Sequence, residues 1–198
     1  MEMNSVNWHS RGYLPHYDSM ELYQSITFRL ADSLPQRILK NLEEDLKILG
    51  VDKLDYQRRN LIDKYLDMGC GCCALKNQQM AKVMKESLIR FDNERYQLIA
   101  WCIMPNHVHA LLKPKIGLAK IIQSWRSYTG RWAFRNNAKY ELGITADSKR
   151  FWMRDYWDRY IRSEKHFYSV LDYIHENPVK AGLCKAPENW KWSSAFEE

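Results

Sequence analysis

The alternation of apolar and polar residues predicts four extended segments. Residues 22–30 alternate and are rich in β-branched and aromatic side chains, which favours a strand. Residues 96–104 form a mostly apolar run of strand length, and residues 107–112 resume it after a Pro-Asn interruption, so we expect a hairpin. Residues 151–161 are aromatic and partly alternate, which indicates strand or extended structure.

Helical periodicity predicts most of the connecting segments. Apolar residues recur at helical spacing in residues 35–49, 78–90 and 118–137, which predicts three helices. A further, highly charged helix is expected in residues 53–66. A last helix is expected from residue 164 to about 176, ending before Asn177-Pro178, because a residue that precedes proline avoids helical geometry. Residues 13–19 are polar, contain Pro15 and are interpreted as an entry loop.

This order of elements predicts an α+β fold of the ferredoxin-like split βαβ type, with an antiparallel sheet and its helices on one face. Residues 35–77 would contain a helical insertion after the first strand. Residues 184–198 would form a docking tail anchored by Trp190 and Trp192. A chain of 198 residues with 45% hydrophobic content suits one domain, residues 1–198, with a substantial core.

The charge distribution indicates a polyanionic partner. The net charge is +6, and the whole excess of basic residues lies between Lys113 and Lys165. A concentrated basic surface favours nucleic acid, although a solvated surface without a partner would have the same composition.

The chain has no membrane-spanning apolar run and no signal-peptide pattern, so we expect a cytoplasmic protein without a membrane partner. The five cysteines are consistent with that compartment, because their odd number and spacing suit neither a disulfide framework nor a zinc ribbon. We interpret them as free thiols, with soft-metal binding at residues 70–73 as the alternative.

His107-Val108-His109 is the sharpest chemical pattern. Residues i and i+2 of a strand point to the same side, so the two imidazoles can share one divalent ion while Val108 faces the core. The alternative is that one or both histidines only satisfy polar groups beside the core.

Tyr173 and Asn177 form a second pattern. At a spacing of four residues they lie on one helix face, where an amide oxygen can complete a hard-cation site and tyrosine can act as a covalent nucleophile. Taken singly, Tyr173 would be a half-buried aromatic residue and Asn177 a helix terminator.

Together these motifs resemble a known family. The segment 104–109, Met-Pro-Asn-His-Val-His, is similar to the HUH motif of single-tyrosine transposases, in which two histidines flank a hydrophobic residue. The segments 158–162 and 172–183, with Arg11-Gly12-Tyr13 at the start, resemble the REP-associated tyrosine transposases. The resemblance spans roughly residues 11–195, and its least diagnostic part is residues 36–77.

The resemblance implies a mechanism. Such enzymes bind single-stranded DNA with a hairpin, from a palindromic repeat, and cleave next to it through a 5′-phosphotyrosine intermediate. Tyr173 would be the nucleophile, and His107, His109 and Asn177 would hold Mg²⁺ or Mn²⁺. Insertion-sequence relatives have glutamine at the position of Asn177, so His175 and Glu176 stay open as alternative ligands.

The basic stretch then predicts DNA contacts. The helix at 118–137 would follow phosphates, and arginines near residues 151–161 would approach the scissile strand. The predicted DNA-binding residues are Lys120, Arg126, Arg131, Arg135, Arg154, Arg159 and Arg162. Each arginine has the alternative of a structural ion pair with Asp155 or Asp158.

Three functions are compatible with these patterns. The first is metal-dependent cleavage and rejoining of single-stranded DNA by a nucleoid-associated transposase. The second is a non-catalytic module that binds a DNA hairpin or RNA, and the third is a metal phosphoesterase that activates water. The sequence also allows both a monomer and a homodimer.

Overall fold

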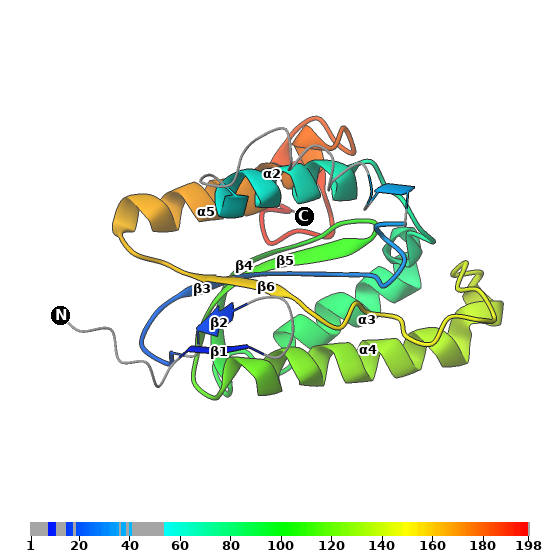
Figure 1. Ribbon diagram of the computed structural model, residues 1–198, viewed down its shortest axis with the longest axis horizontal. Coiled ribbons are helices and arrows are strands. Elements are labelled where there is room, and N and C mark those ends of the chain that lie inside the picture. The colour runs from blue at the N-terminus through cyan, green and yellow to red at the C-terminus, as the bar shows by residue number, and fades with distance from the viewer. Residues whose placement is uncertain are drawn as a thin grey trace.

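The sheet has four antiparallel strands and forms the centre of the protein (Figure 1). The computed structural model describes residues 8–10, 15–17, 19–35, 37, 38, 40 and 54–197, and the side chains of residues 19–35, 37, 38, 40 and 61–197. The strands are β3 (Gln24–Arg29), β4 (Tyr96–Ile103), β5 (His107–Pro114) and β6 (Trp157–Tyr160). They lie in the order β4-β5-β3-β6.

This order is that of the predicted ferredoxin-like split βαβ arrangement. Helices connect β3 to β4, a tight turn connects β4 to β5, and helix α4 (Leu118–Tyr140) connects β5 towards β6. Strand β5 lies between β3 and β4, and β3 lies between β5 and β6, with every pair antiparallel. The predicted fold class is therefore confirmed, including the helix α2 (Leu54–Asp67) inserted after β3.

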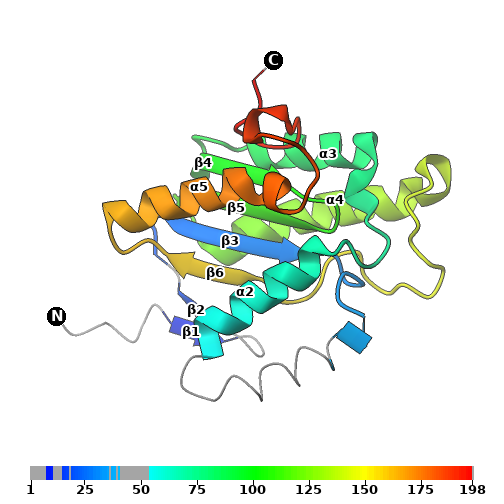
Figure 2. The ribbon, with the colours of Figure 1, turned by 90° about the horizontal axis from the view of Figure 1, so that it is seen from above.

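Helices cover both faces of the sheet, which corrects the expectation that they gather on one. Helices α3 (Gln78–Ile89) and α4 lie on one face, whereas α2 and α5 (Glu164–Lys180) lie on the other (Figures 1 and 2). Seen from above, α5 lies over β4 and β5, and α2 crosses the side of the sheet formed by β3 and β6 (Figure 2). Both faces of the sheet are apolar enough to bury, so a second helical layer is required.

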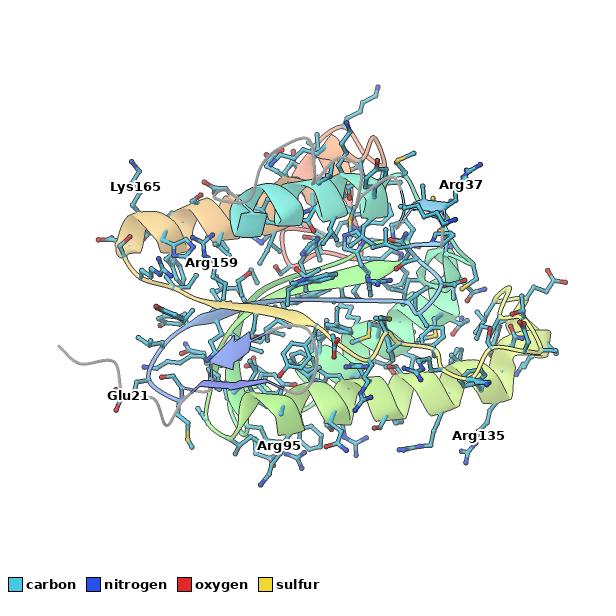
Figure 3. The ribbon with its side chains drawn as sticks, viewed as in Figure 1. Glu21, Arg37, Arg95, Arg135, Arg159 and Lys165 are labelled. Carbon is cyan, nitrogen blue, oxygen red and sulfur yellow. The ribbon has the colours of Figure 1, made fainter. Side chains whose placement is uncertain are left out.

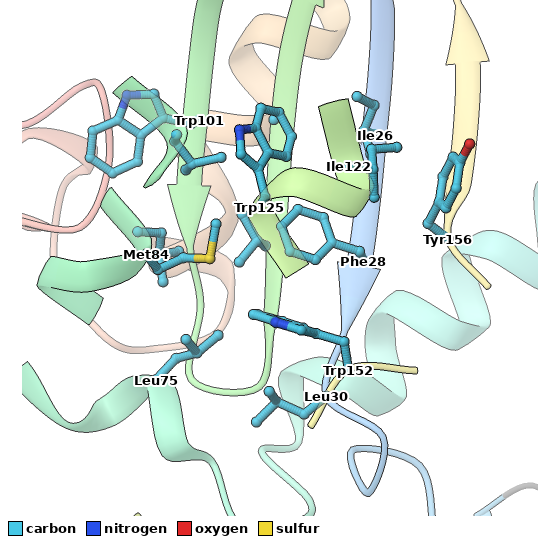
Figure 4. Packing of buried hydrophobic residues seen from close by; sticks show 14 of the residues in the cluster. Ile26, Phe28, Leu30, Leu75, Met84, Trp101, Ile122, Trp125, Trp152 and Tyr156 are labelled. Atoms are coloured by element: carbon cyan, nitrogen blue, oxygen red, sulfur yellow. The ribbon is translucent and has the colours of Figure 1, made fainter. Parts of the chain in front are cut away.

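The larger core lies between the sheet and the helices α3 and α4 (Figure 4). Phe28 of β3 contacts Trp125 of α4 with ring centroids 6.1 Å apart and Trp152 at 4.9 Å. Trp125 Nε1 donates to the Tyr96 hydroxyl, which donates to the Leu88 carbonyl, so the polar atoms of this aromatic core are paired.

The segment after α5 covers the edge strand β4. Trp190 Nε1 donates to the carbonyl oxygen of Ile103, and the Ile103 N–H donates to the Trp192 carbonyl. An edge strand exposes unpaired backbone groups, and these bonds satisfy several of them. None of the helices in the described part of the chain is long and apolar enough to span a bilayer.

Two boundaries differ from the sequence predictions. The predicted entry loop contains the strand β2 (Pro15–Tyr17), which pairs with β1 (Trp8–Ser10). Helix α5 continues through Pro178 instead of ending before it. Because Pro178 lies in the last turn and is buried, the helix loses one backbone bond there and keeps its tertiary contacts. Most of the helix predicted at residues 35–49 lies outside the described residues.

Candidate active site

His107 and His109 lie on β5 and point to the face covered by α2 and α5. Val108 points to the opposite face and is fully buried in the larger core, as strand alternation requires. The two histidine side chains are also buried, and their Nε2 atoms lie 2.9 Å apart. Strand geometry therefore brings two imidazole nitrogens to one point.

Asn106 determines the protonation of His107. The Asn106 amide nitrogen donates to the carbonyl oxygens of Leu66 and Cys70, each at 3.0 Å, which identifies its other side-chain atom as the oxygen. That oxygen lies 2.8 Å from Nδ1 of His107. An amide oxygen only accepts hydrogen bonds, so Nδ1 of His107 carries the proton and Nε2 presents a lone pair.

Thr27 of β3 orients the second histidine. Its hydroxyl lies 2.8 Å from Nδ1 of His109, and Thr27 is the residue opposite His109 in the strand pairing. A hydroxyl can donate or accept, so Thr27 accommodates either tautomer of His109. The hydrogen-bonded Nδ1 atoms of both histidines leave the Nε2 atoms directed at each other.

Burial keeps both imidazoles neutral. It lowers the pKa of His109 to about 3 and lowers the pKa of His107 well below its ordinary value, with His109 adding to the effect on His107. A neutral imidazole is the form that coordinates a metal ion. Both imidazoles therefore stay in the metal-coordinating form at neutral pH.

Tyr173 of α5 lies against this pair. The rings of Tyr173 and His109 meet edge to face with centroids 5.4 Å apart, and the Lys180 ammonium lies 5.3 Å from the Tyr173 ring centroid. The Tyr173 hydroxyl donates a 2.7 Å hydrogen bond to Oδ2 of Asp63. The structure thus brings together three of the residues singled out in the sequence, Tyr173, His107 and His109, within one chain.

The Tyr173 phenol is held in its protonated form. Burial raises the pKa of Tyr173 most strongly, and the charge and hydrogen bond of Asp63 raise it further. A phenol in this state is a weak nucleophile unless its proton is removed as it reacts.

Asn177 is buried one turn after Tyr173, and its amide nitrogen lies 3.4 Å from the Tyr173 carbonyl oxygen. It lines a pocket together with Asp63, Asp67, Tyr173 and Lys180. The predicted ligand is therefore beside Tyr173. The alternative ligand His175 lies elsewhere, because its Nε2 bonds Ser194 of the C-terminal segment at 3.0 Å.

Asp67 is a residue that the sequence analysis missed. Its Oδ1 lies 4.0 Å from Nε2 of His107 and is buried without a hydrogen-bond partner. Burial, followed by the charge of Asp63, raises the pKa of Asp67 to about 7, and Lys180 opposes this shift. Asp63 and Asp67 are four residues apart on α2, and this spacing was the signal that could have predicted a shared face.

Two distances between donor atoms are compatible with a hard divalent cation. Octahedral ligands at about 2.1 Å from a metal lie about 2.9 Å apart when adjacent and about 4.2 Å apart when opposite. The two Nε2 atoms at 2.9 Å and the Asp67 oxygen at 4.0 Å fall within these limits. No group of three His, Cys, Asp or Glu side chains in the described residues is already drawn together as a metal cage.

A cleft of about 210 Å³ lies between α2 and α5 and leads to Tyr173. Ile62 and Asp63 line it from α2, and β3 and β6 contribute Thr27, Trp157 and Arg159. Tyr173 is at the boundary between this cleft and the pocket with Asn177. A polymer strand in the cleft would therefore pass the phenol hydroxyl.

The predicted DNA-binding residues divide by location (Figure 3). Arg159 lines the cleft to Tyr173. Arg135 projects from α4 on the opposite side of the sheet, and exposed residues of the same helix are Lys120 and Arg131. These α4 residues therefore cannot contact the scissile strand at Tyr173.

The other three predicted arginines have different surroundings. Arg126 is half-buried and its guanidinium donates to the backbone carbonyls of Met153 and Arg154, so it supports a loop and is a poor candidate for a phosphate contact. The side chain of Arg154 is exposed. Arg162 is also exposed, and its guanidinium carbon lies 5.1 Å from the Tyr160 ring centroid.

Comparison with known proteins identifies relatives of this chain. The chain is 25% identical to the REP-associated tyrosine transposase of Escherichia coli (strain K12) over 114 residues, which cover 57% of this chain and 63% of the relative. It is 29% identical to a putative REP-associated tyrosine transposase of Haemophilus influenzae (strain ATCC 51907 / DSM 11121 / KW20 / Rd) over 117 residues, covering 50% and 58%. The chain spans about six-tenths of the length of these curated relatives.

A solved structure supports the fold independently. The REP-associated tyrosine transposase bound to a REP hairpin matches with a TM-score of 0.54 at 16% identity, covering 92% of this chain and 82% of that chain. The family model "Transposase IS200 like" matches residues 74–177, which is just over half of the chain and includes His107, His109, Tyr173 and Asn177. By this match the chain belongs to the IS200-like transposase family.

Proposed function

We propose that this protein cleaves and rejoins single-stranded DNA next to a hairpin, with Tyr173 as the nucleophile and a Mg²⁺ or Mn²⁺ ion as cofactor. The observation that carries the proposal is the convergence of His107, His109 and Tyr173 from β5 and α5 at one buried point. Buried polar groups that converge on a cleft are typical of an active site.

The relatives support the type of substrate. The curated relatives are named REP-associated tyrosine transposases, and the matching solved structure is of such a protein bound to a REP hairpin. A hairpin with an adjacent single strand is accordingly the substrate that we propose for this chain. Binding to chromosomal DNA would associate the protein with the nucleoid.

His107 and His109 would hold the cation through Nε2, because their Nδ1 atoms bond Asn106 and Thr27. An oxygen from Asn177 would complete the site, and the unpartnered oxygen of Asp67 is an additional ligand candidate. When bound, such a cation would neutralise and orient the scissile phosphate.

Tyr173 would carry out the covalent step. Its Oη forms a bond to the scissile phosphorus, the bond from phosphorus to the 3′ oxygen breaks, and the DNA 5′ end remains on the enzyme as a phosphotyrosine. In the rejoining step a 3′-hydroxyl attacks the same phosphorus and releases the tyrosine. Arg159 in the cleft would contact the strand on its way to the phenol.

The test uses short single-stranded oligonucleotides that contain the palindromic repeats flanking the gene, incubated with the protein and Mn²⁺. We expect 5′-phosphate-containing DNA to remain attached to the denatured protein. Tyr173→Phe should abolish this adduct, whereas Tyr168→Phe, which removes an exposed hydroxyl on the same helix, should leave it unchanged.

Two outcomes contradict the proposal. If Tyr173→Phe cleaves at the rate of the unmodified protein, the nucleophile is wrong and a water-activating phosphoesterase is favoured. If the protein shifts the hairpin on a gel but never cleaves it in any divalent metal, the protein is a binding module.

A further inference from the structure

We propose that Asp63 is the general base that removes the Tyr173 proton during DNA cleavage, and that it returns this proton during rejoining. The inference rests on the proposed function and adds a catalytic residue to it. It originates from one contact, the 2.7 Å hydrogen bond from the Tyr173 hydroxyl to Oδ2 of Asp63.

The hydrogen bond already lies along the path of the proton. A general base must be within about 2.6–3.2 Å of the group that loses the proton. The phenol donates and the carboxylate accepts, so no side chain has to move before the transfer. Asp63 and Tyr173 also line the same cleft, where the scissile strand would lie.

The surroundings of Tyr173 make a base necessary. A tyrosine phenol ordinarily has a pKa of about 10, so it is protonated near neutral pH. The proton must therefore leave as the bond to phosphorus forms. Since Asp63 becomes neutral in the same step, its repulsion of the phosphate decreases as negative charge builds up there.

Other described side chains near Tyr173 are poorly suited to this task. Both ring nitrogens of His109 are bonded, one to Thr27 and one to His107. Lys180 lies over the ring as a cation, and the Asn177 amide has no basic atom. Asp67 lines the same pocket as Tyr173, but the hydrogen bond of the phenol is accepted by Asp63.

Helix α2 is anchored firmly enough to hold a catalytic group. Ile62 and Leu66, on either side of Asp63, are buried together with Leu34. The Leu66 carbonyl accepts from the Asn106 amide, the same amide group that orients His107. The base and the metal-binding histidines are therefore positioned by one network, which is the arrangement that precise catalysis requires.

The origin of Asp63 is unexpected. The family model matches residues 74–177, which include the histidines and Tyr173 but not α2. The general base would thus be supplied by the inserted helix.

The protons and electrons of the proposed step balance. The phenol proton moves to the Asp63 carboxylate, and the electron pair of the phenol oxygen forms the bond to phosphorus. The departing 3′ oxygen takes a proton from solvent.

Asp63→Asn tests this role because asparagine keeps an oxygen that accepts from the phenol but cannot take the proton. With hairpin oligonucleotide at saturation and Mn²⁺ present, we expect the single-turnover cleavage rate to fall about 10²–10⁴-fold. The hairpin Kd should stay within twofold. Asp172→Asn removes an equal charge from an exposed site next to Tyr173 and should cleave at the normal rate.

Asp63→Glu separates catalysis from folding. It keeps a carboxylate, and we expect it to retain at least tenfold more activity than Asp63→Asn at equal urea-unfolding midpoints. Should Asp63→Asn lower the midpoint, Asp63→Ala with added acetate provides the second measurement, since acetate can replace a missing base but cannot restore the packing of a missing side chain.

A cleavage rate for Asp63→Asn within threefold of the unmodified protein overturns the inference, as does a loss that appears entirely in hairpin Kd. In either case a Tyr173-dependent adduct still formed by the unmodified protein leaves the proposed function intact. Absence of any adduct from the unmodified protein instead rejects the proposed function and the role of Asp63 with it.

Discussion

The side-chain oxygen of Asn106 lies 2.8 Å from Nδ1 of His107, and this contact sets the tautomer of the histidine. The Asn106 amide nitrogen bonds the carbonyls of Leu66 and Cys70, so the orientation of the amide is defined by α2 and the turn that follows it. The inserted helix and the histidine pair are thereby parts of one polar network.

Asn106→Ala should be strongly destabilising. It removes three hydrogen bonds of a fully buried side chain and leaves two carbonyls and an imidazole N–H unpaired. Each unsatisfied buried group costs about 1–3 kcal/mol, so we expect a loss of roughly 3 kcal/mol or more in urea unfolding. Asn136→Ala, which removes only a bond to the Trp132 carbonyl on the surface of α4, should change stability by less than about 1 kcal/mol. Equal losses of unfolding free energy in Asn106→Ala and Asn136→Ala would contradict the role of Asn106 in this polar network.

Thr27→Val should weaken metal binding without preventing folding. Valine has the shape of threonine but cannot bond Nδ1 of His109, so the imidazole loses its orientation. Loss of such a supporting bond lowers metal affinity about 10–100-fold, measurable by Mn²⁺ titration calorimetry. Thr145→Val removes an exposed hydroxyl bond and is the matched control. Unchanged affinity for Mn²⁺ in Thr27→Val would place the metal elsewhere.

Acidification should destabilise the metal-free protein through its histidine pair. Below pH 6.5 the unfolded histidines bind protons while the buried ones stay neutral, so the free energy of unfolding falls as pH falls. Asp67 acts in the opposite direction, because its folded pKa of about 7 exceeds the ordinary value of 3.8 and its protonation between these values favours the folded state.

Each excess proton bound by the unfolded chain contributes about 1.4 kcal/mol per pH unit. Replacing one histidine in His109→Gln should reduce the slope of unfolding free energy against pH by this amount between pH 6 and 5. Urea unfolding in EDTA at several pH values measures this slope for the unmodified protein and for His109→Gln. Identical slopes would mean that His109 titrates in the folded protein.

Arginines on the two sides of the sheet should affect different steps. Arg131→Ala with Arg135→Ala changes only the exposed face of α4, so hairpin affinity should fall while cleavage at saturating DNA stays constant. Removing one phosphate-binding side chain lowers the slope of log affinity against log salt by about 1. Arg159→Ala should instead slow cleavage at saturation, because Arg159 lines the cleft. If Arg131→Ala with Arg135→Ala leaves the slope of log affinity against log salt unchanged, the hairpin binds on another surface.

Periodicity predicted the main elements because each pattern reflects one buried face. Ile26 and Phe28 of β3 alternate into the larger core, and Ile121, Ile122 and Trp125 form the buried stripe of α4. The predicted end of α5 was wrong. The rule that a residue before proline avoids helical geometry describes the isolated chain, whereas burial of Asn177 and Pro178 keeps the last turn helical. The second helical layer was missed because local spacing does not show which face a helix covers.

The candidate site was predicted where the spacing is local and missed where it depends on tertiary contact. Strand alternation was sufficient to pair His107 with His109. Asp63 lies 110 positions before Tyr173 in the chain, and only the packing of α2 beside α5 brings the two side chains together. The surroundings of Arg126 also depend on tertiary contact, because the Met153 and Arg154 carbonyls that its guanidinium bonds are distant in the sequence.

Tyr173 contacts His109 of its own chain, and this has a consequence for stoichiometry. Under the proposed function each polypeptide would contain its own nucleophile and histidine pair, so the number of cleavage centres would equal the number of chains. A mixture of His107→Ala and Tyr173→Phe proteins should then remain as inactive as either one alone, because exchanging partners cannot reunite a nucleophile with an intact histidine pair. Joining two DNA ends would require two centres acting in concert or one centre used twice.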